Sequence, residues 1–295
     1  MTSYSPSMLS ELNAQSAAFR FVALLAAEVS NGQIDLPAFP EVVARVKNAL
    51  SRDDVTPVQI AQVVTAEAGL AARLMTMANS AIMNPGGKPI TELKSAIVRI
   101  GYNNVRTSAV AYAVAKLKQA QEVQAIRQDL EALWREATTT AAVAWAIAKH
   151  TAKFNADEAL LAGLVHNIGK VYILSRSQRM AGDAFKVSDI VAIVRDWHAN
   201  VGRAILEAWK FPAAIVVAVG DHEEFDRPLR QGDLADVLQL AVVIRERLSN
   251  EKESLNSELL KSDVVARLGL NREKLGLVLH DTKEALDSLR GALGG

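Results

Sequence analysis

The sequence predicts an all-α fold. Almost every segment of the 295-residue chain carries apolar residues at helical spacing, and almost none shows the alternation of a strand. Turn-bounded runs of β-branched residues, which are typical of strands, are scarce. Half of the residues are hydrophobic and 22% are charged, as in ordinary globular proteins. We therefore expect a helical protein with a sizeable core.

The first half of the chain divides into helices at clear start and stop signals. An amphipathic helix is predicted at 8–30, and a Gly and two Pro in 31–40 end it. Thr56 followed by Pro57 is a favourable N-cap and first helical position. The other helices predicted in this half cover 40–54, 56–67, 69–83, 91–101 and 103–118, with a loop at 84–89.

The second half begins with a polar stretch and continues as helices. Asn155, with Glu158 three residues later, predicts an N-cap with a partner resembling a capping box. Pro212 stops one of the later helices. The helices predicted in this half cover 133–153, 155–169, 188–212, 213–225 and 234–249, followed by two short helices in 254–291 on either side of LGLNREK.

Composition excludes several classes of function. Lys plus Arg equals Asp plus Glu at 33 each, so the basic excess typical of nucleic-acid binding is missing. The chain has no Cys, which excludes disulfides, Cys-ligated zinc and thiol nucleophiles. The P-loop and nucleophile-elbow motifs do not occur. The N-terminus lacks a secretory signal, and no apolar run reaches the ~20 residues of a membrane span, so we expect a cytoplasmic protein.

Three of the five His residues stand where a metal site is plausible in a helical bundle. His166 closes an apolar helix in the segment GLVHNIGK, His198 lies in the middle of a helix, and His222 follows the apolar run 213–219. His and carboxylate side chains that project inward from several helices are common metal ligands. The alternatives are a contact with the last carbonyls of the helix for His166, a core or rim position for His198, and a plain surface position for His222. The sequence places His150 and His280 on the surface.

Asn167 weakens the metal hypothesis. Its amide oxygen carries no charge and cannot neutralise a dication as an Asp would. The loop NPGGKP at 84–89 could cradle an anion with its two glycines and Lys88, but such a segment is more often only a turn.

Several segments together resemble the HDOD family, the HD-related output domains of bacterial signalling. The resemblance covers about residues 35–250, and its most specific parts are the Asn79–Ser80 pair and the Trp209–Pro212 stop before His222. The matching segments are LPAFPEVVARV, LAARLMTMANSAIM, ITELKSAIVRIG, LWREATTTAAVAWAIA, ALLAGLVHNIGK and the stretch from Trp197 to Phe225.

The resemblance implies a two-part helical bundle with an HD-like second part. The expected division is an N-terminal helix at 1–34, a helical subdomain at 35–120, an HD-like subdomain at 121–250 and a helical tail at 251–295. The first and last of these lie outside the matched segments, so they are candidate docking or dimer surfaces.

The resemblance also implies where the ligands of an active HD phosphohydrolase would fall. The upstream His falls near Glu136, the His–Asp dyad on His166 and Asn167, and the last Asp near Val242. Two further His that some relatives carry fall on His198 and on Asp221–His222. The site therefore resembles a vestigial HD site, in which His166 is expected to hydrogen-bond to His198 or Glu136.

Two functions follow from the resemblance. The first is a non-catalytic regulatory module that contacts a signalling protein or a second copy of itself, with a small ligand in the vestigial pocket as an option. It requires no cofactor. The alternative is a phosphohydrolase, acting on a phosphoester or nucleotide, that uses a divalent metal on His166, His198, His222 and a carboxylate such as Glu136 or Asp221. Neither implies a nucleic-acid or membrane partner.

Overall fold

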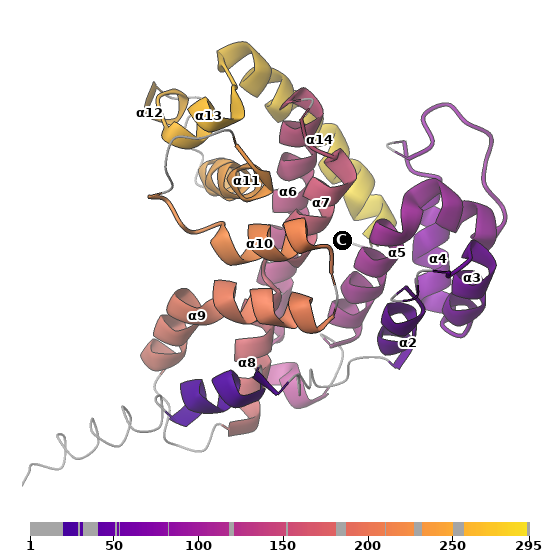
Figure 1. The fold of residues 1–295 in the computed structure, drawn as a ribbon, viewed down its shortest axis with the longest axis horizontal. Helices are drawn as coiled ribbons and strands as arrows, with labels where there is room; N and C mark the ends of the chain where they lie inside the picture. Colours follow the sequence, from indigo (N-terminus) through magenta and orange to yellow (C-terminus); the bar gives the residue numbers. More distant parts are fainter. Residues whose placement is uncertain are drawn as a thin grey trace, which may run out of the picture.

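The computed structural model describes residues 20–28, 30–31, 41–50, 52, 54–81, 83–117, 121–151, 153–180, 187–209, 211–226, 232–249 and 257–293. Every regular element within these ranges is a helix, which confirms the predicted all-α fold. In Figure 1, α2 to α5 gather on one side of the molecule, and the later helices gather on the other. None of the described helices combines the length and the apolar character that crossing a membrane requires.

The first group of helices begins and breaks where the sequence indicates. The Thr56 hydroxyl accepts from the Gln59 amide, and the Gln59 side chain accepts from the Thr56 amide, so a complete capping box starts α3. Gly101 has φ 75°, a left-handed conformation that suits Gly, and it divides α5 close to the predicted break. The helices of this group are α2 (Glu41–Leu50), α3 (Pro57–Thr65), α4 (Ala68–Ala78) and α5 (Leu93–Leu117).

The second group surrounds the long helix α6, and most of its helices agree with the predicted segments. The Asn155 side chain caps α7 by accepting from the amides of Asp157 and Glu158, as its position predicts. The elements are η1 (Gln121–Ile126), α6 (Arg127–Thr151), α7 (Ala156–Val165), α8 (Ile168–Met180), α9 (Val187–Ala208), α10 (Ala213–Asp221) and α11 (Leu234–Ser249).

Two glycines of the segment GLVHNIGK let neighbouring helices approach closely. A Cβ atom on Gly163 would lie 2.4 Å from the Ala141 Cα atom of α6. A Cβ atom on Gly169 would lie 2.0 Å from the His198 carbonyl oxygen of α9. Real Cβ atoms do not come so close to backbone, so both positions require glycine. The segment therefore joins α6 on one side and α9 on the other, and His166 lies between the two glycines.

The tail breaks between Leu268 and Arg272, within LGLNREK as predicted, but the helix that follows is long rather than short. It forms α12 (Ser257–Leu260), α13 (Asp263–Leu268) and α14 (Arg272–Leu293), and α14 alone has 22 residues. α14 packs against α6 and α4. It therefore contacts both the predicted subdomain at 35–120, which contains α4, and the predicted subdomain at 121–250, which contains α6. Its buried side chains include Leu275, Val278 and Leu289. This packing outweighs the low helix propensity of Gly276, which sits within the helix.

An ion-pair cluster fastens α14 to α6. Asp281 lies 2.7 Å from the Lys149 ammonium and 2.8 Å from His150 Nε2. The prediction that His150 is a surface residue was therefore wrong, because a carboxylate from a distant segment covers it. His280 is exposed, as predicted.

Residues 20–28 form a helix that packs against the second group. Phe21 and Leu25 are buried, and Glu28 accepts hydrogen bonds from Tyr172 and Arg176 of α8. This short helix is the indigo segment beside α8 in Figure 1. The rest of the predicted first helix, 8–19, lies outside the described residues.

Candidate functional site

Three buried histidines meet where α7, α9 and α10 come together. His166 caps the C-terminus of α7, His198 lies in α9, and His222 caps the C-terminus of α10. Their exposed fractions are 1%, 1% and 2%. The ring centroid of His222 lies 5.7 Å from that of His166 and 5.7 Å from that of His198, with each pair edge-on. The structure thus brings together three residues that are widely separated in the sequence.

The backbone holds all three rings in the same tautomer. Nδ1 of His166 lies 2.6 Å from the Gly163 carbonyl oxygen. Nδ1 of His198 and of His222 lies 2.8 Å from the carbonyl oxygens of Val194 and Val219. A carbonyl oxygen only accepts hydrogen bonds, so each Nδ1 must carry the proton. In the neutral ring the lone pair is then on Nε2, as in histidines that bind metals.

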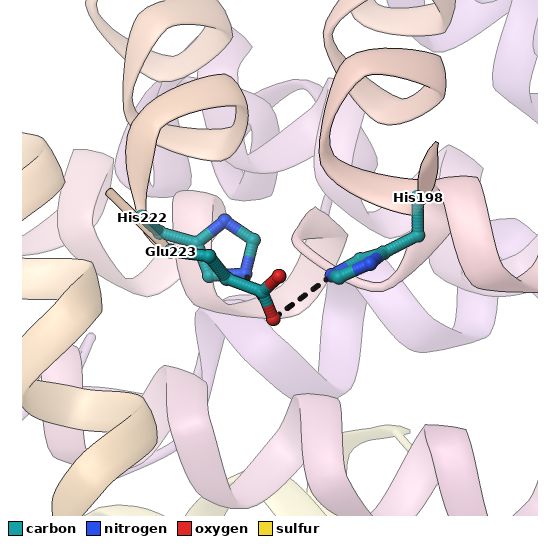
Figure 2. A group of neighbouring side chains, drawn as sticks. All are labelled: His198, His222 and Glu223. Carbon is teal, nitrogen blue, oxygen red and sulfur yellow. Dashed lines mark ion pairs between the residues drawn. The ribbon is translucent and has the colours of Figure 1, made fainter. Parts of the chain in front are cut away.

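Glu223 supplies a carboxylate to the same cluster. Its Oε1 atom lies 3.3 Å from His198 Nε2 and 4.0 Å from His222 Nε2. Figure 2 shows the carboxylate between the two rings, with His222 and Glu223 at the end of one helix and His198 on another. Ligand atoms of the three residues all lie within 4.8 Å of one another.

This arrangement needs a positive charge at its centre. With Nδ1 protonated, a neutral His198 presents a lone pair to the Glu223 oxygen, and two acceptors then face each other. The Glu223 side chain is 41% exposed but His198 is buried, and such a contact is unfavourable unless a proton or a cation lies between the atoms. Two imidazoles and one carboxylate form a recognised zinc ligand set that leaves a fourth position open. The residues His198, His222 and Glu223 therefore fit one transition-metal ion.

Burial also keeps two of the rings in the form that binds metal. Burial lowers the pKa of His166 well below its usual value, and the nearby His222, Lys170 and Arg245 lower it further. Burial likewise lowers the pKa of His222 to about 4. Both rings are neutral at pH 7, and a neutral imidazole is required for coordination. His166 Nε2 is buried without a hydrogen-bond partner, beside the three-residue group.

The positions of the missing HD ligands hold a different network. Nδ2 of Asn167 lies 3.3 Å from a Glu136 carboxylate oxygen, and the same oxygen lies 3.2 Å from Nη1 of Arg245. Arg245 comes from α11, one turn after Val242, and is only 8% exposed. A second dication here would meet the guanidinium of Arg245, which already pairs with the carboxylates of Glu136 and Glu246. The residues present do not fit a second metal.

The structure thus gathers five of the six residues predicted for the vestigial site: Glu136, His166, Asn167, His198 and His222. The sixth, Asp221, pairs with Arg203, and Glu223 stands in the cluster instead. The predicted hydrogen bond from His166 to His198 or Glu136 was wrong, since its Nδ1 bonds to the Gly163 carbonyl oxygen.

Sequence reasoning missed Glu223 and Arg245. Glu223 belongs to the segment GDHEEF, which is equally typical of an acidic surface loop. Its position directly after His222 in the sequence could have identified it as a candidate ligand. Arg245 gave no signal, because only the packing of α11 against α6 brings it to Glu136.

Asn79 and Ser80 lie away from this cluster, at the end of α4. The Asn79 side chain accepts from the Ile90 amide at 2.7 Å and donates to the Ile90 carbonyl oxygen at 2.9 Å. The Ser80 hydroxyl accepts from the Met83 amide. Asn79 therefore closes the loop that contains NPGGKP by pairing both of its amide atoms with the backbone.

A cavity of about 580 Å³ adjoins the histidine cluster. His198, Glu223, Glu136 and Lys170 line part of it. The rest of the wall comes from η1, α6, α8 and α9 and is mainly apolar, through Ile126, Ala132, Leu133, Leu174, Ile190, Val191 and Val194. It also includes Asp129, Ser177, Gln178 and Arg195. The cavity is within the size range of small-molecule sites, which combine apolar walls with a few polar groups.

Comparisons with known proteins bear on the fold and the family. An uncharacterized protein of Treponema pallidum (strain Nichols) is 24% identical over 215 residues, which are 67% of this chain and 39% of that protein. The chain thus matches well under half the length of that relative.

Two solved structures share the fold. A candidate metal-dependent phosphohydrolase of Shewanella amazonensis SB2B has a TM-score of 0.71 at 24% identity, covering 92% of this chain and 99% of the other. A candidate signal transduction protein of Marinobacter aquaeolei VT8 has a TM-score of 0.58 at 18% identity, covering 97% of this chain and 66% of the other.

The sequence pattern of the HDOD domain matches residues 36–225, which is more than half of the chain. This range includes both glycines of GLVHNIGK and the three clustered histidines. The chain belongs to the HDOD domain family.

Proposed function

We propose that this chain is a non-catalytic regulatory module of the HDOD type, which holds one divalent metal ion and acts by contact with a signalling protein. The observation that carries the proposal is the network of Arg245, Glu136 and Asn167. Two-metal hydrolysis requires a second cation that clamps the attacking and leaving oxygens. In this chain a buried guanidinium pairs with the carboxylates of Glu136 and Glu246 at that position, so the described residues there do not offer a suitable ligand set for a second metal ion.

The metal would act as a structural and sensory element. His198 of α9 and the His222–Glu223 end of α10 would be its ligands, so an ion joins two helices that already pack side by side. When bound, the ion supplies a positive charge with an open coordination position. The chain's own residues orient the imidazoles through the Val194 and Val219 carbonyl oxygens.

Exposed apolar side chains near the cluster support a role in protein contact. Trp197, next to His198, is 42% exposed, and Phe225, two residues after Glu223, is 64% exposed. Aromatic residues are enriched in protein interfaces. Occupation of the metal site can therefore affect surface groups through the backbone of the same two segments.

The test combines metal content with an activity screen. The protein is purified without a His-tag or chelator, loaded with Zn²⁺, and measured by native mass spectrometry. We expect one ion per chain, and its loss in His222→Ala. The same protein is assayed on phosphomonoesters, phosphodiesters, cyclic nucleotides and cyclic dinucleotides with Mn²⁺, Mg²⁺ or Ni²⁺. Turnover that disappears in His222→Ala would overturn the non-catalytic assignment.

The regulatory half of the proposal has its own test. Crosslinking and affinity capture from a bacterial lysate are compared between the wild-type chain and the double variant Trp197→Glu/Phe225→Glu. A partner that is captured reproducibly by the wild type and lost in the double variant supports the contact. Exposed changes to Glu should leave the fold intact, which circular dichroism checks. Equal capture by both proteins would argue against these side chains as the docking surface.

A metal-dependent phosphohydrolase with a single ion is the second candidate. The observation in its favour is the open fourth position that a set of two His and one carboxylate leaves on an ion. The activity screen above distinguishes the two candidates, because only the hydrolase predicts turnover that follows metal content.

A further inference from the structure

The cavity beside the histidine cluster has two chemically distinct regions. One region carries Glu136, Lys170, His198 and Glu223, and the polar side chains of Asp129, Ser177, Gln178 and Arg195 also line the cavity. The other is formed by aliphatic side chains of three helices, among them Leu133, Leu174 and Val194. A ligand that fills such a cavity needs a polar head and an apolar body, since unpaired polar groups are costly against aliphatic walls.

The charge of the polar region sets the sign of the head. Glu136 is occupied by Arg245, which lies 3.2 Å away, and Arg245 also pairs with Glu246. Glu223 is a ligand of the proposed ion. Among the described residues no hydrogen bond or ion pair holds the Lys170 ammonium, although Glu136 and Glu223 lie near enough to raise its pKa against the larger lowering effect of burial.

With an ion in place, two positive groups remain without a full counter-charge. The first is Lys170, and the second is the dication, of which Glu223 neutralises only one charge. Both belong to groups that line the same cavity. An anionic head satisfies both, whereas a cationic head would be repelled by both at close range.

We propose that this cavity binds an amphipathic organic acid, with its anionic head at Lys170 and the metal position and its hydrocarbon body between α6, α8 and α9. This inference rests on the proposed function, because the ion supplies part of the charge that selects the head. The acid would be the signal that the module senses. It would lie against α8 and α9, whose close approach at Gly169 and His198 leaves little freedom to adjust separately.

The test titrates decanoate into the zinc-loaded protein by calorimetry. Decyltrimethylammonium has the same tail with a cationic head, and acetate has the head without the tail. We expect decanoate to bind at least tenfold more tightly than either. Across hexanoate, octanoate and decanoate, each buried methylene should raise the affinity by up to ~4-fold. Equal binding of decanoate and decyltrimethylammonium would show adsorption by the tail alone and overturn the inference.

Two variants locate the binding. Lys170→Gln removes the cation and should weaken decanoate binding at least tenfold, while Lys94→Gln, an exposed Lys of α5, is the matched control and should have no effect. Leu174→Asp places a charge in the apolar wall and should weaken decanoate more than acetate. Circular dichroism and zinc content are measured for every variant. If Lys170→Gln retains zinc and binds decanoate as tightly as the wild type, Lys170 does not bind the anionic head and the assignment is wrong.

The same data separate this inference from the proposed function. One zinc per chain, no hydrolysis and no decanoate binding would leave the proposed function standing and refute the ligand. A chain that binds no zinc refutes the metal of the proposed function, and the ligand proposal falls with it.

Discussion

The carbonyl oxygen of His198 lies 2.0 Å from the point that a Cβ atom on Gly169 would occupy. α8 and α9 therefore cross at a distance that only glycine allows, and this crossing places His198 against the end of α7. The position of His198, a proposed metal ligand, thus depends on the absence of a side chain at Gly169, 29 residues earlier in the sequence.

The first prediction concerns this crossing. Gly169→Ala should destabilise the protein by about 1–3 kcal/mol, because the methyl group meets backbone rather than a flexible side chain. It should also reduce zinc content by displacing His198. Urea denaturation and native mass spectrometry measure the two effects.

Gly276→Ala is the matched control for that substitution. Gly276 lies within α14, and a Cβ atom there would meet nothing within 4 Å. The change should therefore stabilise the protein by about 1 kcal/mol through helix propensity. Equal effects of the two substitutions would refute the packing account of Gly169.

The second prediction concerns Glu223 as a ligand of the metal, although its side chain is 41% exposed. Glu223→Gln keeps the shape of the side chain and removes its charge, so zinc affinity should fall at least about tenfold, a cost seen even for outer-shell partners. Competition with a chromogenic chelator measures this affinity. The exposed neighbour Glu224 provides the control, and Glu224→Gln should bind zinc as the wild type does. Zinc binding that is unchanged in Glu223→Gln would remove this residue from the site.

The third prediction concerns the stability of the metal-free protein at acid pH. Burial lowers the pKa of His222 to about 4 from 6.5 and lowers the pKa of His166 in the same direction. Below pH 6.5 the unfolded chain takes up protons that the folded chain does not, so the free energy of unfolding should decrease as the pH falls from 6.5 towards 4.

Urea denaturation in the presence of a chelator, repeated across this pH range, measures that decrease. His222→Asn should reduce the slope because it removes one of the buried groups. His280→Asn, at an exposed position, should leave the slope unchanged. A slope that His222→Asn does not alter would mean that other groups cause the acid sensitivity.

The fourth prediction gives Asn79 a structural role. Asn79→Ala removes two hydrogen bonds to the backbone of Ile90 and should destabilise the protein by about 1–2 kcal/mol. Asn84→Ala, which removes one hydrogen bond to the Lys88 carbonyl oxygen, should cost less. Neither change should alter zinc content, since both residues lie outside the histidine cluster. Loss of zinc in Asn79→Ala would contradict a purely local role.

The sequence predicted helix starts and breaks well where they depend on residues close in the chain. The capping residues Thr56 and Asn155 and the break at Gly101 act within a few residues of themselves, so the structure confirms each close to its predicted position. α14 shows the limit of this reasoning. The sequence predicts only a short helix after LGLNREK, yet burial of Leu275 and Val278 against other helices stabilises one continuous helix of 22 residues despite its internal Gly276.

The sequence by itself determined the all-α class, the starts of several helices and the three histidines that the structure brings together. Only the tertiary structure decided that Glu223 rather than Asp221 joins them, and that Arg245 occupies the place of a second ion. The reason is physical. Helical periodicity and capping depend on neighbours within four residues, whereas a ligand set or an ion pair depends on which side chains the packing of distant helices turns towards one another.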